Sequence, residues 1–229
     1  MKDFIGIFLF LSLFAYEKVS SQIIIKGIGD LETVVRFSKG LTFEHQKSYS
    51  SIEGTPYLSE NFKPGEVYTK DRILYKDSLR YNIYADEIEF KVDDIIHWIA
   101  EPQNIVHVKI EKSSFIFIHN GEKKNKKGSY YELLVGGKCQ LLLKRNIAFL
   151  EAEDAKPYIE AKSAQFRKMN DKYFLQIDNG IPQLITNMKS VKNTLSEKGS
   201  DISKYIKKEK ISTKEKDDLI KLVKYYNSL

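Results

Sequence analysis

The pattern of apolar and polar positions divides the chain into three parts. Residues 4–15 form an unbroken apolar run. Residues 65–185 carry short apolar segments with a period close to two, repeated at roughly ten-residue spacing, which is typical of antiparallel strands. After Pro182 the period changes to about 3.6, which indicates helices. The chain is therefore expected to have an α+β fold, with strands first and helices last.

Alternation within the middle part predicts individual strands and turns. Residues 66–69 and 72–75 flank a polar pair and form a plausible hairpin, and residues 130–135 and 140–143 flank a Gly-Gly-Lys connection. Residues 94–100 fit either a strand or a short helical turn. Together these segments predict an antiparallel β meander that forms a half-barrel or a sandwich. Further strands are expected at 79–84, 87–92, 106–111, 115–118 and 173–177.

Three short helices are expected after the strands. Gly199 can end the first helix, and the Ser-Thr-Lys-Glu run at 212–215 is a capping-box pattern for the start of the third. Helices this short are unstable alone in water, so they must pack on each other or on the sheet. Their apolar faces consist of Ile185, Met188, Val191 and Leu195, then Ile202, Tyr205 and Ile206, then Leu219, Leu222, Val223 and Tyr226.

The first apolar run fits the h-region of a secretory signal peptide. It follows Lys2 and is shorter than the roughly 20 residues that a membrane span needs. Val19 and Ser21 occupy the −3 and −1 positions if cleavage precedes Gln22. The alternatives are an uncleaved anchor or a buried core helix. The expected organisation is a signal peptide at 1–21, a β-rich domain at 22–186 and a C-terminal helical segment at 187–229, in an exported protein that is periplasmic, envelope-associated or secreted.

Charge and cysteine content narrow the function classes. Residues 187–229 carry 11 Lys and 6 acidic residues, whereas the β-rich part is nearly neutral. The pI near 9 therefore gives little support to nucleic-acid binding, and no nucleic acid is expected as a partner. A single cysteine, Cys139, excludes an internal disulfide, so packing must supply the stability. No later run reaches membrane-spanning length, and the composition leaves the oligomeric state open.

Candidate catalytic and metal-binding residues are sparse. The histidines, at 45, 97, 107 and 119, show no helical ligand spacing, and scattered histidines on a sheet surface are the commoner case. Cys139 fits a small half-buried strand residue better than a nucleophile, because Lys138 should point to the opposite face. Glu87 and Glu89 alternate with apolar residues, as on a solvated strand face. No catalytic residue, metal or cofactor is therefore assigned.

Possible partner-binding residues fall into two groups. Tyrosine offers a large contact area at low entropic cost, which suits binding faces, although tyrosine also favours strands in general. The lysine-rich hairpin tip could meet an anionic headgroup or an acidic partner, or simply keep the strand ends soluble. These candidates are Tyr81, Tyr84, Tyr130 and Tyr131, with Lys123, Lys124, Lys126 and Lys127.

Several short segments are distinctive in combination: Gly-Thr-Pro-Tyr-Leu at 54–58, Phe-Lys-Pro-Gly at 62–65, Leu-Arg-Tyr-Asn at 79–82, Tyr-Glu-Leu-Leu at 131–134 with Gly-Lys at 137–138 and Leu-Leu-Leu at 141–143, and the C-terminal residues 201–206, 218–219 and 225–227. Together they resemble a group of small exported proteins of unassigned function from Bacteroidetes-type bacteria. The resemblance implies a cell-envelope or secreted location and supplies no catalytic residues.

Three functions remain open from the sequence. The first is a non-catalytic envelope module that binds a protein or ligand, with the basic helices packed at its end or acting as a docking element. The second is a carrier of an apolar or lipid-like ligand on the concave face of a curved sheet. The third is a hydrolase whose site is assembled across strands. A carrier requires an apolar cavity, an enzyme requires converging His, Cys or carboxylate groups, and an interaction module requires an exposed Tyr-rich or apolar patch.

Overall fold

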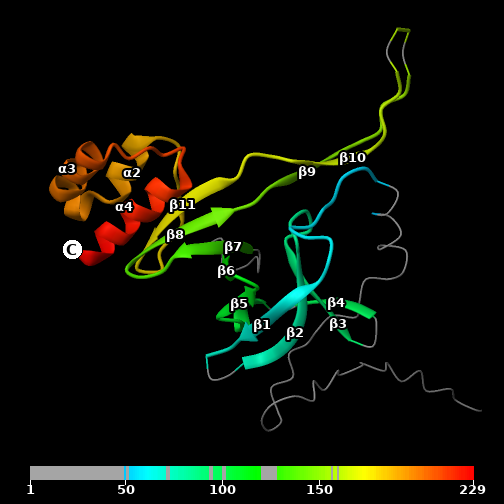
Figure 1. The fold of residues 1–229 in the computed structure, drawn as a ribbon, viewed down its shortest axis with the longest axis horizontal. Coiled ribbons are helices and arrows are strands. Elements are labelled where there is room, and N and C mark those ends of the chain that lie inside the picture. The colour runs from blue at the N-terminus through cyan, green and yellow to red at the C-terminus, as the bar shows by residue number, and fades with distance from the viewer. Residues whose placement is uncertain are drawn as a thin grey trace, which may run out of the picture.

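The computed structural model describes Tyr49 and residues 52–70, 73–92, 95–99, 102–119, 128–155, 157–158 and 160–229. Within these residues, antiparallel strands are followed by three short α-helices, which confirms the α+β expectation (Figure 1). The expected signal peptide at 1–21, His45 and the four lysines of the 120–127 hairpin tip lie outside the described residues.

Among the described residues, ten strands form one open sheet, and two more form a separate pair. The sheet order is β12-β11-β8-β7-β6-β5-β1-β2-β3-β4. The strands of the sheet are β1 (Lys63–Tyr68), β2 (Ile73–Asn82), β3 (Glu87–Val92), β4 (Ile95–Trp98), β5 (His107–Ile110), β6 (Ser113–His119), β7 (Gly128–Val135), β8 (Cys139–Lys144), β11 (Lys172–Ile177) and β12 (Gln183–Leu184). The separate pair is β9 (Ile147–Leu150) and β10 (Gln165–Lys168).

The topology is two meanders joined edge to edge. Strands β1 to β4 pair in sequence, and the chain then returns through the 3-10 turn η1 (Pro102–Asn104) so that β5 pairs with the free edge of β1. Strands β5 to β8 continue in order, and β11 and β12 complete that side. Both expected hairpins, β1–β2 and β7–β8, are confirmed. The ambiguous segment at 94–100 contains the strand β4.

The sheet curls on itself around a core. Strands β2 and β7 are separated in the sheet by β1, β5 and β6, yet the ring of Tyr81 lies 5.0 Å from that of Phe115 and 6.1 Å from that of Tyr130. Curvature brings these side chains together because they project from the same face of the sheet. Residues on this face fill the concave side as one buried cluster: Val67, Tyr75, Leu79, Tyr81, Ile88, Phe90, Ile99, Ile105, Val108, Ile110, Phe115 and Tyr130.

The helices cover the other end of the same face. They are α2 (Met188–Thr194), the 3-10 turn η2 (Ser196–Lys198), α3 (Gly199–Glu209) and α4 (Lys216–Ser228). Their apolar faces meet β7, β8 and β11 in a second cluster, which supplies the packing that such short helices need. Its buried members are Val135, Cys139, Leu141, Leu175, Val191, Leu195, Ile202, Ile206, Ile211, Leu219, Leu222, Val223 and Tyr226.

The helix ends differ from the sequence expectation at two points. Gly199 does not end the first helix: α2 ends at Thr194 with Leu195 as its C-cap, η2 follows, and Gly199 begins α3. The capping box predicted at 212–215 is wrong, because Glu215 is the N-cap of α4 and makes no side-chain capping bond. A capping box is found instead at α2, where Asn187 and Ser190 each accept a hydrogen bond from the other's backbone N–H. Among the described helices, none is long and apolar enough to cross a membrane.

The pair β9–β10 was not predicted and leaves the sheet as an arm. We define the arm as residues 147–168 and the arm tip as residues 151–163. In the sequence the arm lies between β8 and β11, and these two strands pair directly with each other at its base. The arm projects away from the helices, and part of the N-terminal segment before β1 lies beside it (Figure 1).

Candidate binding surface

The structure separates the four tyrosines that the sequence suggested for partner binding. Tyr81 and Tyr130 are buried in the concave cluster, with 3% and 2% of their surface exposed, so they are core residues. Tyr131 is also buried, beside Phe174 on the opposite face of the sheet. Only Tyr84 is exposed, at 44%. The four residues therefore do not form one surface.

An ion pair closes the curl where Tyr81 and Tyr130 meet. One oxygen of Asp86, in the β2–β3 turn, accepts hydrogen bonds from the Tyr81 hydroxyl at 2.7 Å and the Tyr130 backbone N–H at 3.3 Å. The same oxygen lies 2.6 Å from Lys144 Nζ on β8. Asp86 has a φ of 59°, which Asp adopts more readily than most residues. The β2–β3 turn is thereby fastened to β7 and β8.

Burial lowers the pKa of the Lys144 ammonium below its usual range, and the Asp86 carboxylate opposes that effect. Lys144 also donates to the backbone carbonyl of Tyr130 at 3.0 Å. Its ammonium group therefore has both a counterion and a neutral acceptor, as a partly buried charge requires. This arrangement is a structural fastening.

A second buried ion pair corrects the expectation that Glu89 lies on a solvated face. Glu89 is fully buried and accepts hydrogen bonds from Arg80, at 2.5 and 3.0 Å, and from Asn82 at 2.9 Å. The Arg80 guanidinium lies between the rings of Tyr57 and Phe62, 3.6 and 4.4 Å from their centres. The segment before β1 thus covers the outer face of β2 and β3, and this cover is what buries Glu89.

The thiol of Cys139 is fully buried under α4, and burial raises its pKa to about 12. Its backbone N–H donates to Asn227 at 2.9 Å, and the Asn227 amide donates back to its carbonyl at 2.8 Å. Lys138, in the turn before β8, pairs with Glu197 of η2, which also accepts a hydrogen bond from Tyr226 of α4. It therefore reaches the helices that cover Cys139, and the predicted placement on the opposite face is wrong because Lys138 lies outside the strand. Cys139 therefore belongs to the helix–sheet interface.

Of the three described histidines, His107 and His119 line one open groove, whereas His97 is buried on β4. Within the described residues, no group of three His, Cys, Asp or Glu side chains is placed to hold a metal ion. Each histidine packs on a neighbouring ring: His97 on Phe90, His107 on Tyr68 and His119 on Phe117.

An open groove of about 740 Å³ lies on the face of the sheet opposite the core. It crosses β5, β6, β7, β8 and β11, and side chains that alternate with the core residues line it. Val106 and Ile181 are 45% and 71% exposed at its rim. One part of the lining is polar, since Gln140 donates to Asn179 there. Its main apolar residues are Val106, Ile116, Ile118, Leu133 and Ile181.

The root of the arm is held firmly by aromatic packing. Tyr84 packs on Phe166 of β10 with ring centres 5.1 Å apart, and Phe149 of β9 packs on Phe166 at 5.5 Å. The Phe166 N–H donates to the Glu53 carbonyl at 2.8 Å. Gly54 is required beside it, because its φ is 81° and a Cβ there would lie 2.4 Å from the Phe166 carbonyl oxygen. Tyr84, the exposed one of the four candidate tyrosines, therefore lies at the base of the arm.

The arm tip, in contrast, packs against nothing among the described residues. Every described residue from 151 to 163 is exposed, and only the backbone bridge and ion pair between Glu153 and Lys162 tie its two sides together. Tyr158, at the turn, is 107% exposed and has a φ of 66°. A bulky residue in the left-handed region is an outlier, since Gly or Asn would fit that turn with less strain.

Sequence reasoning missed the arm because its tip lacks apolar alternation. Its one signal was an aromatic residue after Pro157 in a polar, acidic stretch. No protein-family model, curated protein or solved structure matches the chain.

Proposed function

We propose that the mature chain acts outside the cytoplasm as a non-catalytic interaction module, and that the arm is its contact element. The observation that carries the proposal is Tyr158, a fully exposed tyrosine at the end of a projecting hairpin. Burying a tyrosine in a core stabilises a fold substantially, and a Gly or Asn at this turn would cost less backbone strain. Tyr158 makes no packing contact in its own fold, and its backbone conformation is strained. A tyrosine with both properties suits a role in contacting a partner.

The construction of the arm supports the same role. Its root is fixed by Tyr84, Phe149 and Phe166, so the tip is presented in a defined direction. Pre-ordering a contact element lowers the entropy lost on binding. Tyrosine is among the residues that most often dominate binding energy at protein interfaces. A rigid root with an exposed aromatic tip therefore suits protein recognition.

Site-specific photocrosslinking in the native cell tests this function. The photoreactive residue p-benzoylphenylalanine is placed at position 158, with the same replacement of Leu58, which is 37% exposed on the body, as control. We expect a reproducible crosslinked protein from position 158 and not from position 58. Crosslinking at neither position, or equally at both, would rule out the arm as the contact element. N-terminal sequencing of the exported chain, which should begin at or near Gln22, checks the location.

The groove supports a second candidate, the carriage of an apolar ligand. The concave face cannot serve, because the side chains of the buried cluster fill it. The outer groove has the volume of a small-molecule site, and its apolar side chains are interspersed with His107, His119 and three amide side chains. Native mass spectrometry of protein purified from its native cells would show a bound lipid-sized mass in the wild type. Ile118→Glu should abolish that mass, and Tyr158→Ser should leave it unchanged.

A further inference from the structure

The arm tip is acidic. Residues 151–163 contain four carboxylates and two lysines, a formal charge of −2. Glu153 is paired with Lys162, whereas Glu151, Asp154 and Glu160 have no ion-pair partner among the described residues. All of these side chains are exposed. The tip therefore carries a net negative charge when both of its lysines are counted.

The helical segment at 187–229, called the cap below, is basic, with a formal charge of +5. Five of its lysines lie where α3 ends and α4 begins, together with Glu209, Glu215, Asp217 and Asp218, so residues 207–218 carry a formal charge of +1 and the rest of the cap carries +4. All five lysines of this connection are exposed, and only Lys208 lies within 4 Å of a carboxylate. The five are Lys207, Lys208, Lys210, Lys214 and Lys216.

The cap also offers an aromatic platform. Tyr205 of α3 and Tyr225 of α4 stack with ring centres 3.9 Å apart and planes 8° apart, and both remain half-buried at the surface. Lys221 lies one helical turn before Tyr225, and Lys208 lies about one turn after Tyr205. An exposed tyrosine from a partner could pack on this pair while lysines met its acidic neighbours.

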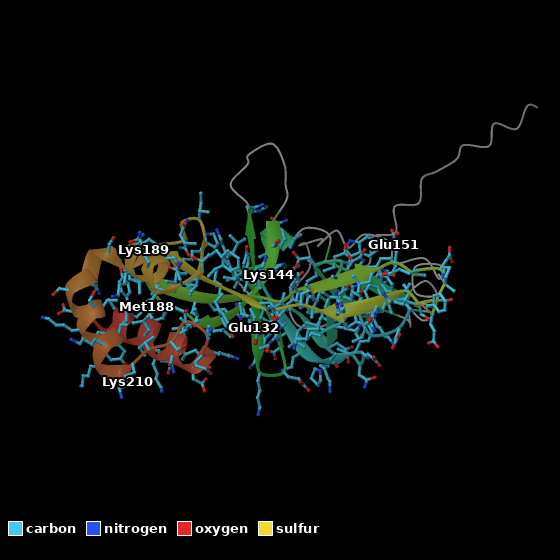
Figure 2. The ribbon with its side chains drawn as sticks, turned by 90° about the horizontal axis from the view of Figure 1, so that it is seen from above. Glu132, Lys144, Glu151, Met188, Lys189 and Lys210 are labelled. Atoms are coloured by element: carbon cyan, nitrogen blue, oxygen red, sulfur yellow. The ribbon has the colours of Figure 1, made fainter. Side chains whose placement is uncertain are left out.

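The acidic and basic surfaces lie at opposite ends of the molecule. Figure 2 shows Glu151 toward one end of the long axis and Lys189 and Lys210 at the other. The two surfaces therefore do not meet within one molecule in this structure. A second copy of the chain presents the complementary surface at the same concentration as the first.

We infer that the acidic arm tip of one copy docks on the basic cap of a second copy. This inference rests on the proposed function of the arm and names its partner. The contact is heterologous, since two different surfaces meet, and repeated contacts of this kind build a ring if the rotation closes and an open chain if it does not. Opposite charges guide the encounter, and Tyr158 supplies the apolar anchor.

Sedimentation equilibrium of the purified mature protein tests the contact. At about 100 μM protein and about 50 mM NaCl we expect association, which should weaken about tenfold or more at about 500 mM NaCl, where screening is strong. Tyr158→Ser should also weaken it about tenfold, without changing the fold, because the side chain makes no packing contact. A wild-type protein that stays monomeric in low salt would overturn the inference.

Two charge-reversal variants make the test directional. Glu151→Lys with Asp154→Lys reverses the arm tip and leaves the Glu153–Lys162 pair intact. Lys214→Glu with Lys216→Glu weakens the cap, and acidic residues at the start of α4 suit the helix dipole. We expect each variant to be monomeric alone. A mixture of the two should associate, because one retains a native arm and the other a native cap.

The control is Glu60→Lys with Glu111→Lys, which changes the net charge as the arm variant does but at exposed positions on the body. It should associate like the wild type. A mixture that stays monomeric, or a control that also fails to associate, would contradict an arm-to-cap contact. The photocrosslinking result separates the two ideas: crosslinks from position 158 to a different protein would leave the proposed function standing and remove self-association.

Discussion

At the scale of single residues, the buried charges fasten parts of the chain that are distant in sequence. Asp86 joins the β2–β3 turn to β8 through Lys144, and Glu132 of β7 accepts hydrogen bonds from Arg145 and from Ser113 of β6. Alternation along a strand tells which face a side chain occupies, but it does not tell whether another segment covers that face. A buried carboxylate such as Glu89 therefore looks the same in the sequence as an exposed one.

We expect Asp86→Asn to destabilise the protein by about 2 kcal/mol. Asn tolerates the left-handed backbone and can still accept from Tyr81, so the change isolates the loss of charge beside Lys144. Removing the carboxylate from a partly buried ammonium destabilises a fold less than it does for a fully buried ammonium, but more than it does for a surface charge. Urea unfolding at neutral pH measures the effect. Adding Lys144→Met to the variant should restore part of the stability, because no unpaired charge then remains.

The matched control is Glu111→Gln, which removes the exposed ion pair with Lys63 at 3.6 Å. It should change the free energy of unfolding by less than about 0.5 kcal/mol. Equal losses for the two substitutions would show that the Asp86 pair does not fasten the curl.

Glu87 should make stability depend on pH. Burial, with the nearby charges of Glu89 and Asp86, raises the pKa of its carboxyl from 4.5 to about 6. Between these values the folded state binds more protons than the unfolded state, so stability falls as pH rises through this window. Glu87→Gln should remove that fall and should be about 1 kcal/mol more stable than wild type at pH 7, after allowance for partial exposure. Urea unfolding of both proteins at about pH 4.5 and 7 measures the effect. Parallel pH profiles of the unfolding free energy for wild type and variant would contradict the prediction.

At the scale of elements, the arm divides sharply into a packed root and a free tip. The root contains Phe149 of β9 and Phe166 of β10, and each of these strands is only four residues long. Such short segments give a weak pattern, and the segment that covers them, around Glu53, is distant in sequence. Strands of the main sheet were predictable where several apolar residues alternate with polar ones, because those apolar residues pack in a buried cluster.

Removal of the arm tip should leave the fold intact. Replacing residues 151–163 by a short Gly-Ser turn should change the unfolding free energy by less than about 1 kcal/mol, because surface residues without packing contribute little. Circular dichroism melting of the shortened and intact proteins gives the comparison. A loss of several kcal/mol would mean that the tip packs on the body, and the arm would no longer be a free contact element.

At the scale of the whole molecule, one continuous face carries two cores. Strand β7 contributes Tyr130 to the concave cluster and Val135 to the helix-covered cluster. The shared strand couples the two halves, since either cluster loses packing when β7 separates. The expected boundary near residue 187 therefore marks a change from strands to helices in the sequence, while packing runs across it.

The two cores should unfold in one transition. Leu79→Ala in the concave cluster and Leu222→Ala in the helix-covered cluster each remove a fully buried leucine and should each cost about 3 kcal/mol. Far-ultraviolet circular dichroism and the fluorescence of Trp98, the single tryptophan, should report the same midpoint in both variants. A Leu222→Ala variant whose circular dichroism changes before its Trp98 fluorescence would show two independent units.

The sequence by itself determined the class of fold, most of the main-sheet strands and the three helical faces, because the periods of two and 3.6 follow from local backbone geometry. Tertiary structure decided which faces were covered: it buried Tyr81, Tyr130 and Glu89, and it left the arm tip and Tyr158 in solvent. Coverage depends on contacts between segments far apart in the chain, such as β2 with β7 or Glu53 with β10, and no local pattern encodes them.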